Sequence, residues 1–255
     1  MDQAGKAHRF ADLHIKGQPL VLYNIWDAGS ARAVVEAGAG AVATGSWSLA
    51  AAQGFKDGQA IPLELVEMIV KRIVSATDAP VTVDFEAGYG DTPSEVAANA
   101  ARIIEAGAVG INFEDGIPGA GEMRDVRQQC ARIRAVREKA DELGVPLFIN
   151  ARTDLFLQSD SAQHGGLVAE AEARAAAYAE AGAGGFFVPG LLDEAAIERL
   201  CRVVALPVNV MMTQYAPAIS RLAEVGVSRV SFGPLPFIRL MGALKRQAQE
   251  IHSSG

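Results

Sequence analysis

Short apolar runs alternate along the whole chain with longer segments in which apolar residues recur every three or four positions. The short runs predict eight buried strands: Leu20–Ile25, Ala41–Thr44, Val81–Phe85, Gly110–Phe113, Leu147–Asn150, Gly185–Val188, Val208–Met211 and Arg229–Phe232. The longer segments have helical period and follow the strands as Ser30–Ala37, Pro62–Ala76, Pro93–Ala106, Asp125–Leu143, Leu167–Ala181, Asp193–Val204, Ala216–Val225 and Pro236–Ile251. This alternation is typical of a parallel sheet covered by helices.

One phrase of sequence recurs where the predicted helices end. It reads Glu36-Ala37-Gly38, Glu105-Ala106-Gly107 and Glu180-Ala181-Gly182, with a looser copy at Glu224-Val225-Gly226. Glycine readily takes the left-handed conformation that stops a helix, and a short connection then leads into the next strand. The repeat therefore supports a succession of similar helix-to-strand units.

The number of these units points to a closed barrel. Eight of them in 255 residues predict an α/β protein with one (β/α)₈ TIM barrel, spanning residues 1–255. A doubly wound open sheet is the alternative that the same alternation allows. No Pro- or Ser-rich linker divides the chain, which favours one domain. We expect a helical segment around Leu13 to Lys16 to cover the bottom of the barrel.

Charge and cysteine content narrow the class of partner. The formal net charge is −7, with 30 acidic against 23 basic side chains and no Lys/Arg cluster, so we expect neither nucleic acid nor an anionic membrane as a partner. Cys130 and Cys201 are the only cysteines, which fits free thiols in a reducing compartment. No apolar leader or membrane-spanning run is found, and we therefore expect a cytoplasmic protein with a small-molecule substrate.

Two carboxylates at the end of the third predicted strand are the first candidates for chemistry. Asp84 and Glu86 are two residues apart, so in a strand they point to the same side. Solvated acids at a strand end are the alternative interpretation of this pair alone. Mg²⁺ prefers oxygen ligands and usually takes only one or two protein carboxylates, so the pair is also a candidate metal site.

The other strand ends strengthen the metal hypothesis. In a parallel barrel all carboxyl ends open on one face, where active sites lie. These ends include Asn24-Ile25-Trp26-Asp27, Thr44-Gly45-Ser46-Trp47-Ser48, Asn112-Phe113-Glu114-Asp115, Asn150-Ala151-Arg152-Thr153-Asp154 and Asn209-Val210-Met211. The opposite ends are mostly Gly, Ala and Pro. Carboxylates gathered on one rim resist ionising unless a cation neutralises them, which favours a bound divalent metal.

The same motifs, in this order and spacing, resemble the isocitrate lyase/phosphoenolpyruvate mutase superfamily. The motifs are Asn24-x-Trp26-Asp27, Gly45-Ser46-Trp47, Gly54-Phe55-Lys56-Asp57-Gly58, Asp84-Phe85-Glu86-x-Gly88-Tyr89-Gly90, Gly110-Ile111-Asn112-Phe113-Glu114-Asp115, Asn150-Ala151-Arg152-Thr153-Asp154 and Val188-Pro189-Gly190. The resemblance runs from about Tyr23 to Pro234. It implies a TIM barrel whose last helix is exchanged between subunits of a homodimer or homotetramer, a Mg²⁺ or Mn²⁺ cofactor, and a 2-oxo acid substrate.

The resemblance also implies roles for individual residues. Asp84 matches the direct metal ligand, whereas Asp57, Glu86 and Glu114 match acids that hold the metal largely through water. Arg152 matches the arginine that binds substrate, and Tyr89 and Glu114 stand beside it as candidate catalytic residues. The remaining candidates for substrate binding are Tyr23, Trp26, Gly45, Ser46, Trp47 and Asn209. A guanidinium holds a carboxylate with two hydrogen bonds, and backbone N–H groups in a tight turn hold an anion, so the chemistry suits these positions.

The loop after the fourth strand departs from the better-known members. Residues Glu114 to Arg124 lack the lyases' Lys-Lys-Cys-Gly-His sequence and the mutases' gating lysine, and the loop's glycines suggest a mobile lid that ends in a surface arginine, Arg124. We expect a Mg²⁺-dependent lyase that cleaves a carbon–carbon bond of a small 2-oxo or 2-hydroxy di- or tricarboxylate through an enolate. The alternatives are P–C bond chemistry of the phosphoenolpyruvate mutase or phosphonopyruvate hydrolase type, and a non-catalytic protein that binds a metal and a 2-oxo acid.

Overall fold

The barrel predicted from the sequence is confirmed. The computed structural model describes residues 1–253 and contains eight parallel strands: β1 (Leu20–Leu22), β2 (Val42–Ala43), β3 (Val81–Asp84), β4 (Gly110–Glu114), β7 (Phe148–Arg152), β8 (Gly185–Phe187), β9 (Val208–Met211) and β10 (Arg229–Ser231). Their order is β1-β10-β9-β8-β7-β4-β3-β2. A single parallel bridge between Ile25 and Thr44 joins the two ends of this order, with Ile25 N donating to the Ala43 carbonyl over 2.8 Å. The open-sheet alternative is therefore wrong.

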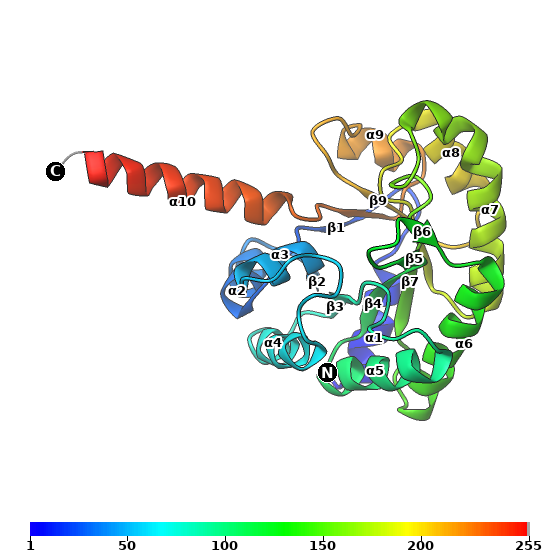
Figure 1. Cartoon of the computed structure of the whole chain (residues 1–255), viewed down its shortest axis with the longest axis horizontal. Coiled ribbons are helices and arrows are strands. Elements are labelled where there is room, and N and C mark those ends of the chain that lie inside the picture. The colour runs from blue at the N-terminus through cyan, green and yellow to red at the C-terminus, as the bar shows by residue number, and fades with distance from the viewer. Residues whose placement is uncertain (254–255) are drawn as a thin grey trace.

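Helices lie around the barrel, except for the last one, which projects away from it (Figure 1). They are α1 (Gln3–Asp12), α2 (Ala28–Glu36), α3 (Ser46–Ala52), α4 (Leu63–Ser75), α5 (Pro93–Glu105), α6 (Val126–Glu142), α7 (His164–Glu180), α8 (Glu194–Val203), α9 (Ile219–Glu224) and α10 (Leu235–Ser253). Capping boxes begin α2 at Asp27 and Ser30, and α5 at Thr92 and Glu95, so side chains satisfy the free N–H groups of those first turns. No helix among residues 1–253 is long and apolar enough to cross a membrane.

Four local features differ from the prediction. The N-terminal helix is α1, whereas residues 13–16, which we expected to be helical, form a turn and a bridge. The short helix α3 directly follows β2, where only a turn was expected. The loop after β4 contains a small antiparallel hairpin of β5 (Gly116–Ile117) and β6 (Glu122–Met123), and a 3₁₀ turn, Ser161–Gln163, precedes α7.

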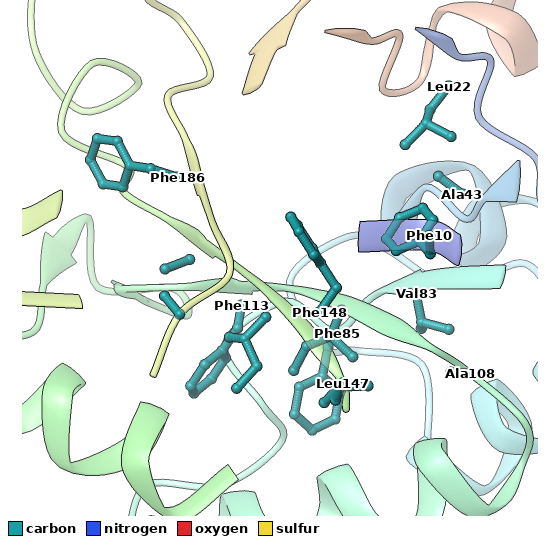
Figure 2. Close-up of a cluster of buried hydrophobic side chains, with 14 of the residues drawn as sticks. Phe10, Leu22, Ala43, Val83, Phe85, Ala108, Phe113, Leu147, Phe148 and Phe186 are labelled. Atoms are coloured by element: carbon teal, nitrogen blue, oxygen red, sulfur yellow. The ribbon is translucent and has the colours of Figure 1, made fainter. Parts of the chain in front are cut away.

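Aromatic residues close the bottom of the barrel. Phe10 of α1 is fully buried, and Figure 2 shows it among buried side chains that include Val83 of β3 and Phe148 of β7. The rings of Phe10 and Phe148 meet edge to face at 5.4 Å, and the imidazole of His14 stacks on Phe148 at 4.0 Å. The apolar rings seal one end of the barrel, so an active site is expected at the other end, where the strands have their carboxyl ends.

The last helix projects away from the barrel (Figure 1). Only Pro236 and Phe237 at the start of α10 are buried, whereas Ile238, Leu240, Leu244 and Ile251 are exposed. A helix that leaves such an apolar face to water is typical of a surface that packs against another chain.

Candidate active site

A small pocket opens at the carboxyl ends of the strands. Its volume is about 160 Å³, below the range of about 300–1,000 Å³ for drug-sized ligands, which favours a small substrate. The lining residues are Asn24, Gly45, Ser46, Trp47, Asp57, Asp84, Asn112, Arg152, Leu157, Phe187, Pro189, Met211, Ser231, Gly233 and Pro234. One guanidinium, two carboxylates and the start of α3 therefore share one small cavity.

Asp84 lies at the end of β3 and is held in place from one side only. The backbone N–H of Ser46 donates to its Oδ2 over 3.0 Å, and the backbone N–H of Asp84 donates to the Thr44 hydroxyl over 2.9 Å. The second carboxylate oxygen, Oδ1, is buried without a hydrogen-bond partner. A buried carboxylate oxygen without a partner is costly, so its position in the pocket fits a metal ligand.

The segment that follows Asp84 is a strained turn. Glu86 has a φ of 50° and Tyr89 a φ of 56°, a left-handed conformation that non-glycine residues rarely adopt. Arg132 of α6 donates to the carbonyls of Ala87 and Gly90, and Asn99 of α5 donates to the Tyr89 carbonyl over 2.8 Å. Two helices thus hold a backbone conformation that the turn would not keep alone, as is common at functional sites.

This turn places the carboxylate of Glu86 behind the pocket. Its Oε2 accepts from the backbone N–H of Gln59 over 2.5 Å, and its Oε1 accepts from the Tyr89 hydroxyl over 3.3 Å. Burial, with the nearby charges of Asp84 and Asp57, raises the pKa of Glu86 to about 8. Burial and Asp84 also raise the pKa of Asp57, although its loop lies at the exposed rim. A cation bound beside Asp84 would favour the ionised forms of Glu86 and Asp57 and so oppose both shifts.

The donor set fits a hard divalent cation. No group of three or more Asp, Glu, His or Cys side chains within residues 1–253 is arranged to hold a metal ion by itself. Mg²⁺ needs only one or two protein carboxylates and fills its other positions with water and substrate oxygens. The unpartnered oxygen of Asp84, with Asp57 on the facing rim, fits that mode, and Glu86 and Glu114 remain predicted contacts through water.

Arg152 is fixed between two carboxylates. Its Nη1 lies 2.8 Å from Glu114 Oε2, and its Nε lies 2.6 Å from Asp154 Oδ1. Burial raises the pKa of Glu114, and Arg152 opposes that shift. Since two of its nitrogens are held by the protein and the side chain lines the pocket, the guanidinium has a defined orientation toward a bound anion.

The fully buried carboxylate of Asp115 holds in place the segment that carries Arg152. Asp115 accepts from the backbone N–H of Asp154 over 2.9 Å, and its other oxygen accepts from Tyr178 over 2.8 Å and from Arg174 over 3.1 Å. Burial raises the pKa of Asp115, and Tyr178 and Arg174 of α7 oppose that shift. Asp115 therefore links α7 to the segment that positions Arg152.

The predicted site residues fall into three groups. Those that line the pocket are Gly45, Ser46, Trp47, Asp57, Asp84 and Arg152, whereas Glu86, Tyr89 and Glu114 stand behind it in contact with one another or with Arg152. Three candidates for substrate binding lie elsewhere. Tyr23 and Trp26 line an apolar groove beside α10, and Asn209 is fully buried inside the barrel.

Asn24, Asn112 and Ser231 also line the pocket, although the sequence did not single them out as substrate-binding residues. Asn24 is a structural link, because its Oδ1 accepts from the backbone N–H groups of Phe232 and Gly233 over 2.9 Å each. The sequence did contain a signal for Asn112, which is the one polar residue between Ile111 and Phe113. Successive residues of a strand point to opposite faces, so Asn112 can point into the barrel while its apolar neighbours pack against the helices outside.

The predicted lid is anchored at its end. Arg124, which we expected on the surface, is buried, and that prediction is wrong. Its guanidinium donates to the Gly116 carbonyl over 3.0 Å and to Asp91 over 2.9 Å. The tip of the hairpin, residues 118–122, remains exposed, so movement of the lid stays a prediction.

Known proteins share this architecture. A family profile described as phosphoenolpyruvate phosphomutase matches residues 10–252. The 2-methylisocitrate lyase of Escherichia coli is 27% identical over 255 residues, which cover 98% of this chain and 83% of the lyase. A crystal structure from Burkholderia cenocepacia, solved under a provisional phosphonomutase name, is 50% identical with a TM-score of 0.95 and covers 97% of this chain and 99% of its own. The structure of a phosphonopyruvate hydrolase with oxalate and Mg²⁺ aligns with a TM-score of 0.85, and the alignment covers 100% of this chain and 88% of the hydrolase. The two sequences are 21% identical, so this likeness shows the shared fold alone.

Proposed function

Because this chain belongs to the phosphoenolpyruvate mutase family, within the isocitrate lyase/phosphoenolpyruvate mutase superfamily, we propose that it is a Mg²⁺-dependent carbon–carbon lyase. Its substrate is a small 2-oxo or 2-hydroxy di- or tricarboxylate, cleaved to leave an enolate. The resemblance seen in the sequence is confirmed, as is the prediction of an enzyme of this superfamily. The reaction and the substrate class are the proposal.

The observation that carries the proposal is the pairing of Asp84 with Arg152 in one small pocket. Asp84 presents a buried oxygen without a partner, and Arg152 presents a guanidinium oriented by Glu114 and Asp154. This pair suits an α-oxo carboxylate as substrate. Its oxo oxygen and its carboxylate oxygen lie next to each other, so a metal held by Asp84 and the guanidinium of Arg152 can bind them together. When bound, Mg²⁺ would supply Lewis-acid stabilisation of the negative charge that develops on the substrate oxygen.

The chain's own residues then divide the remaining work. The guanidinium of Arg152 binds the carboxylate or oxo group and stabilises negative charge that grows as the bond breaks. The turn at Gly45 to Trp47 begins α3. The N–H groups of Gly45 and Ser46 already bond to Ile25 and Asp84, so the N–H of Trp47 is the candidate donor to the far carboxylate of the substrate. Tyr89 hydrogen-bonds to Glu86, and the pair is the candidate route for a proton behind the pocket.

Chemistry at a P–C bond is the second candidate, favoured by the phosphonomutase name of the 50% identical structure. The hairpin loop from Asp115 to Arg124 contains no lysine, and Lys56 is exposed on the rim beside Asp57. Phosphoryl transfer needs cations around the transferring group, so this loop favours the lyase. A protein that binds a 2-oxo acid without turnover is the remaining alternative, and the retained acid cluster opposes it.

We also propose that a second copy of this chain covers α10. The exposed apolar residues of α10 match a groove lined by Tyr23, Trp26 and Val34 beside the start of the same helix. Exchange of α10 between two copies would bury both surfaces and produce the predicted homodimer, or two such pairs in a homotetramer. The expected location in the cytoplasm remains a prediction.

A turnover screen in the presence of Mg²⁺ tests the proposed reaction. Oxaloacetate, isocitrate, 2-methylisocitrate, 2,3-dimethylmalate and phosphonopyruvate are offered, and pyruvate, glyoxylate, oxalate, CO₂ and phosphate are measured. Release of an oxo acid, oxalate or CO₂ without phosphate supports the lyase, whereas phosphate from phosphonopyruvate favours P–C chemistry. The Asp84→Asn variant is the control and should lose both turnover and Mg²⁺ binding. An Asp84→Asn enzyme as active as the wild type would place the metal elsewhere.

A further inference from the structure

A buried arginine lies inside the barrel below the pocket. Arg229 of β10 has no exposed surface. In the parallel pairing of β10 with β9, it is the partner of Asn209. Ser231, two residues further along the same strand, lines the pocket, so the two side chains point to the same side of the sheet. The side chain of Arg229 therefore lies one layer, or about 6–7 Å, below the pocket wall formed by Ser231.

This arginine has no salt bridge to any residue between 1 and 253. Its Nη2 donates to the side-chain oxygen of Asn112 over 2.9 Å, whereas its Nε and Nη1 are buried without partners. Its guanidinium faces the ring of Phe10, 5.9 Å away, on the side of the closed barrel bottom. Burial lowers the pKa of Arg229 to about 9, and the charge of Asp84 opposes this shift. Burying an unpaired charge is unfavourable, and such departures from stable packing concentrate at functional sites.

The contact with Asn112 determines the orientation of that amide. Two donors, Nη2 of Arg229 and Nδ2 of Asn150, both point at one atom of Asn112, over 2.9 Å each. A guanidinium can only donate hydrogen bonds, so the atom that receives it must be the amide oxygen. The amide nitrogen of Asn112 is then left to face the pocket that this residue lines. Asn112 is also the cross-strand neighbour of Asp84, so its amide lies beside the proposed metal ligand.

We propose that Arg229 is a positioning residue that aims the amide N–H of Asn112 at an oxygen of an anionic substrate held beside Asp84. Arg229 also contributes a buried positive charge beneath that oxygen. The inference rests on the proposed function, because it needs an oxyanion bound next to the metal ligand. It adds Asn112 to the substrate-binding residues and gives the unpaired cation of the barrel interior a function.

The role of Arg229 is tested by measuring how its substitution changes the binding of an anion, oxalate, and of a cation, Mg²⁺. Arg229→Met removes the positive charge but keeps much of the side-chain volume. We expect the Kd for oxalate, measured calorimetrically at saturating Mg²⁺, to rise at least fivefold. The Kd for Mg²⁺ alone should stay constant or fall, because a nearby positive charge has been removed. A variant that merely loses stability would weaken both, whereas Arg229→Lys should restore oxalate binding to within about threefold of the wild type.

Two further variants keep the test sharp. Asn112→Asp retains an oxygen for Arg229 and Asn150 but replaces the donor that faces the pocket with an acceptor. It should therefore weaken oxalate binding while the melting temperature stays within a few degrees of the wild type. Arg137→Met is the matched control, because Arg137 donates to backbone carbonyls of Leu147 and Gly182 at the opposite ends of the strands. It should lower the melting temperature without changing the oxalate Kd.

The outcomes separate this inference from the proposed function. An unchanged oxalate Kd in both Arg229→Met and Asn112→Asp would overturn the inference and leave the lyase proposal standing. Wild-type protein that binds neither Mg²⁺ nor oxalate would overturn both. Weaker oxalate binding in both variants, with Mg²⁺ binding retained, would support the positioning role.

Discussion

The buried His14 at the bottom of the barrel makes the stability of this protein depend on pH. Its Nδ1–H donates to the Phe10 carbonyl over 2.8 Å, which leaves Nε2 without a proton and buried without a partner. A second proton would have to enter at Nε2, in an apolar site that Arg229 already makes positive. Burial and the charge of Arg229 lower the pKa of His14 to about 3.

The size of the effect follows from the difference between the folded and the unfolded chain. An unfolded histidine has a pKa of about 6.5, so between pH 3 and 6.5 the unfolded state binds more protons and stability rises with pH. Between pH 7 and pH 5, His14 should lower the free energy of unfolding by about 2 kcal/mol. The loss should reach about 3 kcal/mol at pH 4.

Urea unfolding of the wild type and of His14→Phe, followed from pH 7 to pH 4, measures this contribution. The variant keeps an aromatic ring on Phe148 but cannot take up a proton, so the stability difference between the two proteins should shift by about 2 kcal/mol in the variant's favour from pH 7 to pH 5. Other titrating groups cancel in this comparison. His8→Gln, which changes an exposed histidine of α1, is the control. Parallel pH profiles for wild type and His14→Phe would refute the reasoning.

Three further predictions follow from contacts described above. Asp115→Asn breaks a buried ion pair with Arg174 of α7, so it should lower the free energy of unfolding in urea by about 3–5 kcal/mol. Its control is Asp125→Asn at an exposed helix cap, which should change the free energy of unfolding by no more than about a few tenths of a kcal/mol. Arg152→Lys cannot bridge two carboxylates and a substrate, so the oxalate Kd should rise at least tenfold; an unchanged Kd would contradict the role of Arg152. Leu244→Glu on α10 should convert the proposed oligomer to monomers in analytical ultracentrifugation, while Gln249→Glu, on another face of the helix, should not.

The sequence predicted the barrel well because its signals are local and repeated. Each strand is a short apolar run, and a glycine stands two residues after the end of α2, α3, α5, α6, α7 and α9, so errors at element ends stay within a few residues. The helix α3 was missed because its seven residues, Ser46–Ala52, are too few to show a helical period. The hairpin after β4 was missed because its strands are two residues each, too short to show the alternation of a strand.

The pocket was predicted less completely, because the sequence does not show how deep in the barrel a side chain lies or where a residue beyond a strand end points. The sequence placed Asn209 at a strand end near the rim, but Met211, two residues later on the same side, is the residue of β9 that lines the pocket. Tyr23 and Trp26 follow β1 after its ladder has ended at Leu22, so strand alternation no longer fixes where they point. The role of Arg229 depends on a hydrogen bond to Asn112, which lies 117 residues away along the chain.

The single bridge that closes the barrel gives the molecule a seam. Between β1 and β2 the ladder consists of Ile25 and Thr44 alone, with Ile25 N bonded to Ala43 and Gly45 N bonded to Ile25, whereas β4 and β7 share five paired positions. Amide hydrogens at the seam should therefore exchange with solvent sooner than those between β4 and β7. Gly45 and Asn24 line the pocket, and Tyr23 and Trp26 line the groove beside α10, so both surfaces border the seam. Ligand in the pocket and a helix in the groove should therefore each slow exchange at the same amides.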